Sequence, residues 1–419
     1  MNRRTWRWIF LAACGELLLL PFALAPVAGR ELPDLTWLPA APQWPAPQGR
    51  VVEVATVDAL ASAVRDAQPG DTISIAEGRY FLPDLLELRT DRVTLRGKSG
   101  RREAVILDGS RMRGGELLAI TACTDAVVAD LTVQNVRWNG IKLNADRGCS
   151  RVTIHHCILR NIWQRAVKSP FVPPAERERL APRDCRIQHC LFYNDRAKEP
   201  ADDAADTYGG DYVGGIDAMC CRNWSIADNV FFQIQGHTRQ GRGAVFLWQD
   251  SRDCLVERNV VIDCDVGISL GNSWLGKERV HCTNCIVRNN FVAGAPESGI
   301  LADYTRDCRI VHNTIWDPDS RKGRLIRIVH DNDDLQVAGN LLLGSPLRQE
   351  STSRMTVKGN VVLTDERALV DPRTGNLHLR RPLDGVTDAA GQTDTVKTDF
   401  DNRPRGAKPD IGADEWEAP

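Results

Sequence analysis

Two lysines, Lys142 and Lys168, occupy the same position in consecutive copies of a repeated segment, and Arg165 shortly precedes the second of them. If the copies stack in register as strands, the two lysine backbones lie about 5 Å apart, the ordinary spacing of neighbouring strands. Like charges at that distance repel by roughly 3 kcal/mol at an effective dielectric constant near 20. An anionic ligand would relieve this repulsion, whereas on a plain solvated face the lysine side chains would simply diverge. Asp217, at the same position one copy later, completes the candidate catalytic group on the strands.

The elements that must position these side chains are the short strands of a repeat that runs from residue 125 to residue 360. One phrase consists of an aliphatic residue, two variable residues and then Asn or Cys, and a second phrase of small and aliphatic residues falls between its copies. The aliphatic positions of the second phrase recur at steps of 26, 49, 29, 23 and 32 residues, which is typical of a solenoid with insertions. Strands of period two without intervening helices predict an all-β parallel β-helix.

Two columns of residues are expected to line the inside of this coil. The Asn positions of the first phrase would form a hydrogen-bonded ladder from rung to rung. The sequence contains 13 Cys, and those five positions before the Asn column are predicted to be reduced, buried core residues rather than disulfides. Five histidines next to the turns, by contrast, are expected to face solvent: His155, His156, His189, His281 and His312.

The outward positions of the second phrase carry the polar and aromatic candidates. Because alternate residues of a strand point to opposite faces, the position between two buried aliphatics points out. This predicts one outward column, formed by Lys142, Lys168, Asp217, Phe246, Ser269 and Leu301. A second outward column follows two residues later and includes Asn144, Trp248 and Asp303.

Two long loops are predicted beside the lysines. The distance from the Asn or Cys position to the next outward strand is 9 or 10 residues in ordinary repeats, but 26 and 16 residues in two successive repeats. Long loops on a rigid scaffold commonly carry function, so we place a cleft on the second to fourth rungs. The aromatic and basic residues of these loops are Tyr208, Tyr212, His237, Arg239 and Arg242.

The first of these loops is also rich in aspartate. Four carboxylates within ten residues could hold Ca²⁺ through hard oxygen ligands. The alternative is a solvated acidic loop, because the spacing is unlike that of an EF-hand. The four candidate ligands are Asp202, Asp203, Asp206 and Asp211.

The first 29 residues are predicted to be a signal peptide or an N-terminal anchor. Arg3, Arg4 and Arg7 precede an apolar stretch, and Val27-Ala-Gly29 is a small-residue cleavage site, so we expect a secreted, periplasmic or cell-envelope protein. An uncleaved anchor would be its one membrane contact. The Pro-rich residues 30–50 follow as an extended linker. A formal net charge of −2 argues against a nucleic-acid binder, and we expect a monomer.

Two segments resemble the pectate-lyase-like superfamily. The stretch from Asp58 to Tyr80, which includes Pro69-Gly-Asp71, is similar to its opening, and Thr398–Arg405 with Asp410–Glu415 is similar to the closing segment of exported bacterial members. The resemblance, which covers residues 51–415, implies a right-handed β-helix over 51–365, a capping helix over 59–67, and a C-terminal extension over 366–419 that packs on or caps the solenoid. The superfamily includes polysaccharide lyases, glycoside hydrolases, epimerases and non-catalytic proteins.

For a uronate polymer, the resemblance implies β-elimination. This reaction needs cations that neutralise the sugar carboxylate, a base for the proton on the adjacent carbon, and an acid for the leaving oxygen. We expect Lys168 to be the base or a carboxylate clamp, Lys142 and Arg165 to bind the carboxylate, and His237 or Arg242 to donate the proton. The expected substrate-binding residues are Trp248, Asn144, Tyr208, Tyr212 and Arg239, and Ca²⁺ is a possible cofactor.

Two alternatives to an acidic-polysaccharide lyase stay open. A glycoside hydrolase needs two carboxyl groups about 5 to 9.5 Å apart. Asp217 and Asp303 are predicted to lie three rungs, or about 14 Å, apart, so a hydrolase would have to recruit a loop carboxylate such as Asp211. The second alternative is a non-catalytic protein that binds carbohydrate or serves as a scaffold.

Overall fold

The computed structural model describes residues 31–276, 278–320, 324–389 and 396–417. The predicted signal peptide or anchor, residues 1–29, lies outside the described residues. Within the described part of the chain, no helix combines the length and the apolarity needed to cross a membrane.

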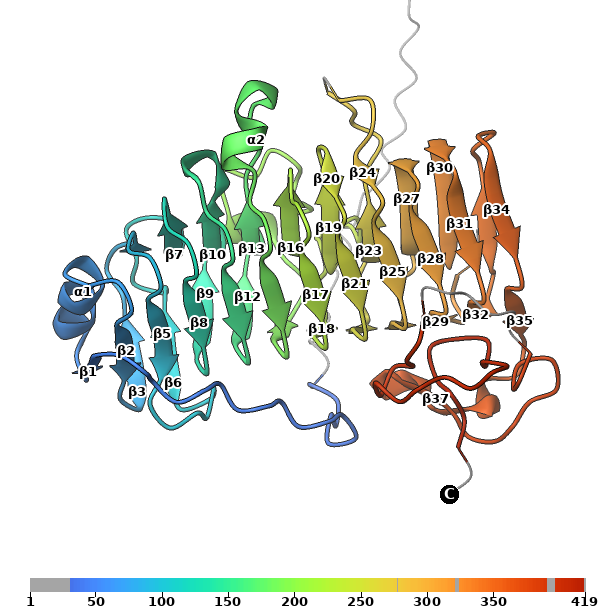
Figure 1. Ribbon diagram of the computed structural model, residues 1–419, viewed down its shortest axis with the longest axis horizontal. Helices are drawn as coiled ribbons and strands as arrows, with labels where there is room; N and C mark the ends of the chain where they lie inside the picture. The colour runs from blue at the N-terminus through green and yellow to red at the C-terminus, as the bar shows by residue number, and fades with distance from the viewer. Residues whose placement is uncertain (1–30, 277, 321–323, 390–395, 418–419) are drawn as a thin grey trace, which may run out of the picture.

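Three long parallel sheets form the walls of a right-handed β-helix, as predicted (Figure 1). The first sheet runs from β1 (Val51–Val54) to β34 (Met355–Lys358), and the second runs from β3 (Gly78–Phe81) to β35 (Val361–Leu363). The main strands of the third sheet are, in order along the solenoid, β4 (Leu86–Leu88), β7 (Glu116–Thr121), β10 (Asn139–Asn144), β13 (Arg165–Ser169), β16 (Gly214–Met219), β19 (Val245–Trp248), β23 (Val266–Leu270) and β27 (Ser298–Arg306).

Helix α1 (Val57–Arg65) covers the first rung, at the blue end of the solenoid in Figure 1. The Thr56 side chain caps it by accepting a hydrogen bond from the Ala59 N–H, and Leu60 and Val64 are buried against the core. The capping helix expected over 59–67 is therefore present, shifted by two residues to 57–65 and preceded by the Thr56 cap.

The residue just before the Asn column lies in the turn from the first sheet to the second, and the geometry of this turn explains why it is usually Asn, Asp or His. On each rung the residue before the column has a positive φ, a conformation in which Asn, Asp and His are enriched. The residues concerned include His156, His189, Asp228, Arg258, Asn289 and His312. The next residue then enters the core, where the amide of Asn229 donates to the Oδ1 of Asn259, and so on in an unbroken ladder through Asn290, Asn313, Asn340 and Asn360.

The predicted Cys column is confirmed, whereas the prediction for the histidines is wrong for three of them. All 12 cysteines of the described residues are free and buried. His155, His281 and His312 are also buried, with 1 %, 0 % and 0 % of their surface exposed. Segments remote in sequence cover two of them: His155 bonds to the carbonyl of Pro42 and His312 to that of Asp410, whereas His281 bonds to the nearby carbonyl of Asn272. Because Pro42 and Asp410 lie outside the repeats, the repeat pattern could not predict these two contacts.

The N-terminal linker and the C-terminal extension cover the outside of the second sheet. Trp37 contacts the rings of Phe291 and Phe400, and Phe291 and Phe400 stack with their centroids 4.0 Å apart. The extension contains the antiparallel pair β36 (Leu369–Asp371) and β37 (Asn376–Leu379) and lies below the solenoid in Figure 1. The two long loops, by contrast, lead into β16 and β19 and therefore lie beside the third sheet.

Candidate functional site

The outer face of the third sheet holds the predicted column in one register. Lys142 pairs with Lys168 and Lys168 with Asp217, and the column continues through Phe246, Ser269 and Leu301. The inward neighbours of these residues belong to the hydrophobic core. The outward column predicted from the sequence is confirmed, and the register aligns these six side chains along the solenoid axis.

Asp217 is the centre of a buried charge cluster. Its Oδ2 accepts hydrogen bonds from Arg165 Nε at 2.6 Å and from Lys168 Nζ at 2.9 Å, and its Oδ1 accepts one from Trp248 Nε1 at 2.9 Å. Burial by itself raises the pKa of Asp217, but the charges and hydrogen bonds of Lys168 and Arg165 outweigh it and lower the pKa to about 2. The carboxylate is thus a fixed anion that orients two cations.

Arg165 is too deeply buried for the role expected from the sequence, which was direct binding of a ligand carboxylate. Only 1 % of its surface is exposed, and its guanidinium lies 3.8 Å from the centre of the Tyr212 ring. Tyr212 stacks on Tyr208 at 5.5 Å, and Arg242 covers Tyr208 at 5.0 Å. Arg165 therefore anchors a stack in which two tyrosine rings lie between two arginines, and this stack fastens both long loops to the sheet.

Lys168 is the more exposed cation of this cluster, with 11 % of its side chain exposed against 1 % for Arg165. One rung away, Lys142 is more accessible, at 25 % of its side chain, and donates a 2.8 Å hydrogen bond to Glu116 on the neighbouring strand β7. Asn144 donates to the hydroxyl of Thr121, 2.8 Å away on the same strand. The pairing of each lysine with a carboxylate on an adjacent rung accounts for the tolerance of two stacked lysines.

The second loop supplies a histidine that is oriented by a residue the sequence reasoning missed. His237 Nδ1 lies 2.8 Å from an oxygen of Glu199, and both side chains are nearly half exposed. An imidazole held through one nitrogen by a carboxylate presents its other nitrogen for proton transfer. Glu199 lies in the acidic loop, so the contact joins the two loops, and no local sequence signal marks it.

Arg239 and a buried carboxylate secure the base of the same loop. Arg239 forms ion pairs with Asp263 and Asp265. Asp265 has no exposed surface and accepts backbone hydrogen bonds from Gly236 and Gly241. Burial raises the pKa of Asp265 to about 6, even though Arg239 and the two N–H groups oppose the rise. Arg239 is therefore engaged in holding the loop rather than pointing at the sheet.

The four aspartates of the acidic loop all have protein partners. Asp202 pairs with Arg196, and Asp203 and Asp206 both pair with the buried Lys198. Asp203 also accepts from Trp138 and Gln164, and Asp211 accepts from Thr238. Among the described residues, no three of these carboxylates converge on one point, and the Ca²⁺ assignment stays a prediction.

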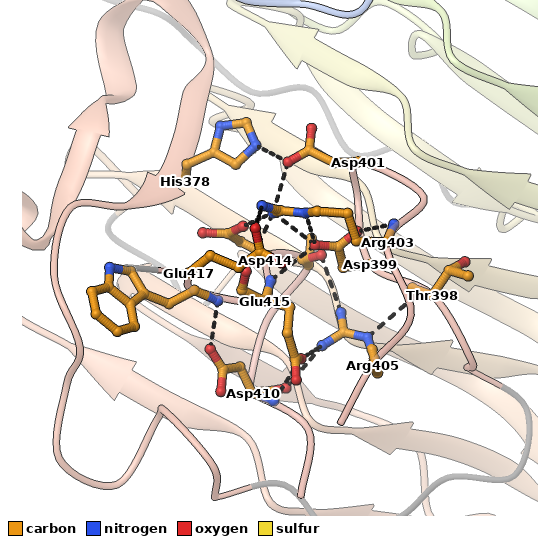
Figure 2. A network of polar contacts seen from close by, with 12 residues as sticks. His378, Thr398, Asp399, Asp401, Arg403, Arg405, Asp410, Asp414, Glu415 and Glu417 are labelled. Atoms are coloured by element: carbon orange, nitrogen blue, oxygen red, sulfur yellow. Dashed lines mark hydrogen bonds and ion pairs between the residues drawn. The ribbon is translucent and has the colours of Figure 1, made fainter. Parts of the chain in front are cut away.

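In the described residues, one set of possible metal ligands does converge, and it lies in the C-terminal extension: His378, Asp401 and Asp414. Figure 2 shows that the guanidinium of Arg403 occupies the middle of this group, where it pairs with Asp399, Asp401 and Asp414. Arg405, nearby, pairs with Glu415. The closing motif of the sequence thus forms a network of ion pairs that holds the extension together.

Comparisons with known proteins agree with this architecture. A family profile described as "Right handed beta helix region" matches residues 181–342. The chain is similar to a crystal structure of pectate lyase Pel9A, with 12 % identity, a TM-score of 0.50, and coverage of 88 % of this chain and 97 % of that one. A search of curated proteins found no match.

Two further similar structures have lower scores. The A-module of the Azotobacter vinelandii mannuronan C-5 epimerase AlgE6 has 13 % identity and a TM-score of 0.48, covering 74 % of this chain and 95 % of that one. PfbA, a surface adhesin of Streptococcus pneumoniae, has 13 % identity and a TM-score of 0.44, covering 73 % and 85 %. At these identities the likeness shows the fold alone.

Proposed function

Because the chain has the right-handed parallel β-helix fold of the pectate-lyase-like superfamily, we propose that it is an exported lyase of a uronate-containing polysaccharide. In the proposed β-elimination, a base removes the proton from C5 of the uronate and the electron pair forms a C4=C5 double bond. The C4–O bond breaks, and the leaving oxygen takes up a proton. One glycosidic bond is thereby converted into an unsaturated end and a new hydroxyl end, with no water consumed.

The observation that carries this proposal is the cluster of Lys168, Arg165 and Asp217 on the outer face of the third sheet. Asp217, whose pKa is about 2, is an ionised carboxylate that holds Lys168 Nζ by a 2.9 Å hydrogen bond. We therefore assign Lys168 to the sugar carboxylate, as a clamp that makes the C5 proton acidic. Lys142, one rung away, would contact the same polysaccharide chain.

Arg165 is assigned a positioning role, since its guanidinium is buried between Asp217 and Tyr212. His237 is assigned to proton transfer, because Glu199 orients its ring and leaves the opposite nitrogen available. A single group of this kind could remove the C5 proton and return a proton to the leaving oxygen.

The test is to incubate the purified chain with pectate, alginate and chondroitin and to follow the ultraviolet absorbance of the unsaturated product. Appearance of this chromophore together with new reducing ends supports the lyase. New reducing ends without the chromophore would show a hydrolase and overturn the proposal. The same assay with and without a chelator would test whether Ca²⁺ is a cofactor.

A hydrolase finds little support in the geometry of Asp217. A glycosidase needs one carboxyl group that stays protonated until it donates, whereas Asp217 has a pKa of about 2 and accepts three hydrogen bonds. A carbohydrate-binding protein without catalysis is favoured by one observation, the pairing of both lysines with carboxylates of the protein. Binding of polysaccharide without any product would establish that second function.

A further inference from the structure

The last rung of the solenoid has three unpaired strand edges. It consists of β33 (Leu347–Gln349) in the third sheet, β34 in the first and β35 in the second, and it lies at the end opposite α1 in Figure 1. Among the described residues, each of these strands pairs with the strand of the preceding rung and with no strand on its other side. Free edges of this kind are templates for pairing with another chain.

Core positions are exposed on this last rung. Val357 occupies the register position of Val337, and Val362 that of Leu342, and both earlier residues belong to the buried core. At the last rung the same inward positions are 39 % exposed for Val357 and 47 % exposed for Val362. The hydrophobic core of the solenoid is therefore open to solvent at this end.

The first rung, by contrast, is closed by the chain itself. Helix α1 packs Leu60 and Val64 onto the core, where both are buried. Solenoids need such a cap over their terminal repeats to stay soluble. The C-terminal extension packs Leu369, Leu377 and Phe400 on the outer face of the second sheet instead. In the part of the chain that the structure describes, the last rung thus has no counterpart of α1.

The shape of the last rung matches a second copy of itself. The chain enters this rung at β33, continues through β34 and leaves it at β35. Because each rung advances by about 4.8 Å along the axis, β33 lies slightly behind β34, and β35 slightly ahead of it. A two-fold axis through β34, perpendicular to the solenoid, sets the leading strand of one copy against the trailing strand of the other. These two strands, β33 and β35, are both three residues long.

The strand directions also suit such a pair. Both copies wind in the same right-handed sense, so the strands of two ends that face each other run in opposite directions. Their edges then meet as antiparallel pairs, which form regular backbone hydrogen bonds. An extended peptide would fill one edge and leave the apolar centre and the other two edges uncovered. The first rung of another copy is blocked by α1.

The centre of the last rung carries no charge that would oppose contact between two copies. Its charged residues Arg348 and Lys358 occupy outward positions, in register with Arg327 and Ala338 of the rung before. Arg348 is also paired with Glu350. The inward positions are uncharged: Leu347, Gln349, Met355, Val357 and Val362.

We propose that this open end, formed by β33, β34 and β35, is a dimerisation surface that takes a second copy of the chain end to end. β34 pairs with β34 of the second copy across the two-fold axis, and β33 pairs with β35 of that copy. The two cores then join, and all three edges are covered. An interface one rung across is small, so we expect a Kd on the order of 10 µM. This dimer replaces the monomer expected from the sequence and does not depend on the proposed lyase activity.

The test is sedimentation velocity of the purified protein from about 1 to about 200 µM, where the mass should rise from one chain to two. Val357→Glu places a carboxylate in the apolar centre of the interface and should weaken the dimer at least about tenfold. Val362→Glu should do the same on β35. Val51→Glu is the matched control, because Val51 is a 45 % exposed valine on β1, the edge strand at the other end, and it should leave the association unchanged.

Amide hydrogen exchange gives a second readout on the unaltered protein. Protection of β34 and β35 should increase with protein concentration, whereas that of β1 should not. Circular dichroism checks the fold of each variant, which should be retained because the substituted valines are exposed. A single-chain mass over the whole concentration range would overturn the proposal. A dimer that survives both Val357→Glu and Val362→Glu, or one that is lost in Val51→Glu, would overturn it as well.

Discussion

The indole of Trp248 donates a 2.9 Å hydrogen bond to Asp217 from the neighbouring rung of the third sheet. The same carboxylate accepts hydrogen bonds from Lys168 and Arg165 through its other oxygen. One anion therefore sets the position of a cation that can meet a ligand carboxylate and of an aromatic ring that can meet a sugar face. The predictions below follow from this arrangement and from the core that supports it.

Lys168→Ala should abolish elimination, with a loss of at least about 100-fold in kcat/KM, since it removes the cation that stabilises the developing negative charge. Ultraviolet absorbance of the unsaturated product measures the effect. Lys98→Ala is the control and should retain full activity, because Lys98 is an exposed lysine in the turn after β5 (Thr94–Gly97) that pairs with Glu53. If a lyase activity exists and survives Lys168→Ala, the site has been misplaced.

Asp217→Asn should destabilise the protein, because it leaves Arg165 and Lys168 without the anion between them. Removal of one partner from a buried ion pair costs about 3 to 5 kcal/mol. Urea unfolding, followed by circular dichroism, should show a clear fall in the midpoint. Asp84→Asn breaks an exposed ion pair with Arg113 and should leave the midpoint almost unchanged. Equal midpoints for the two variants would contradict the buried cluster.

Asp265 should make the stability of the protein depend on pH between about 4 and 6. Its folded pKa is about 6, raised by burial from an ordinary value of 3.8, so the protonated form is favoured by folding. The resulting stabilisation is fully present below pH 3.8 and is lost as the pH rises through 6, on the order of 3 kcal/mol in total. Arg239 faces this carboxyl, and Asp211 adds to the rise.

Urea midpoints from pH 3.5 to pH 7 measure this dependence. Asp265→Asn should flatten the profile, because the amide keeps an acceptor for the Gly236 and Gly241 N–H groups and does not titrate. Glu103→Gln, at an exposed position, should leave the profile unchanged. A profile that keeps its full slope in Asp265→Asn would assign the titration to another group.

Asn290→Ala should break the ladder at its centre. The buried amide donates to Asn313 Oδ1 and Val256 O, and its Oδ1 accepts from both the backbone and the side chain of Asn259. Unsatisfied buried groups cost about 1 to 3 kcal/mol each, so we expect a loss of about 3 kcal/mol or more. Asn360→Ala, at the partly exposed end of the ladder, should cost less than half as much in the same urea experiment.

The cysteines of the solenoid should be inert thiols. Burial raises the pKa of the Cys123 thiol to about 12, and the 12 cysteines of the described residues form no disulfide. In a Cys14→Ser background, a thiol reagent should label none of these 12 quickly in the native protein and all of them in denaturant. A reducing agent should leave the unfolding midpoint unchanged. A midpoint lowered by reduction would reveal a disulfide.

The repeat pattern was sufficient for the solenoid, the Asn and Cys columns and the outward column of Lys142, Lys168 and Asp217. All of these depend on the period of two along a strand and on the stacking of one rung on the next. Where the prediction was wrong, as for the burial of His155 and His312, the covering residues came from Pro42 and Asp410, outside the repeats. Periodicity carries no information about such contacts.

The sequence by itself determined which residues share a column, because strand geometry ties spacing along the chain directly to position in the sheet. Only the tertiary structure decided how their charges are used. Asp217 was buried between two cations and an indole, Lys142 acquired Glu116 as a partner, and Glu199 was brought to His237. These pairings depend on the conformation of long irregular loops and on the contacts between rungs, and neither follows a repeating rule.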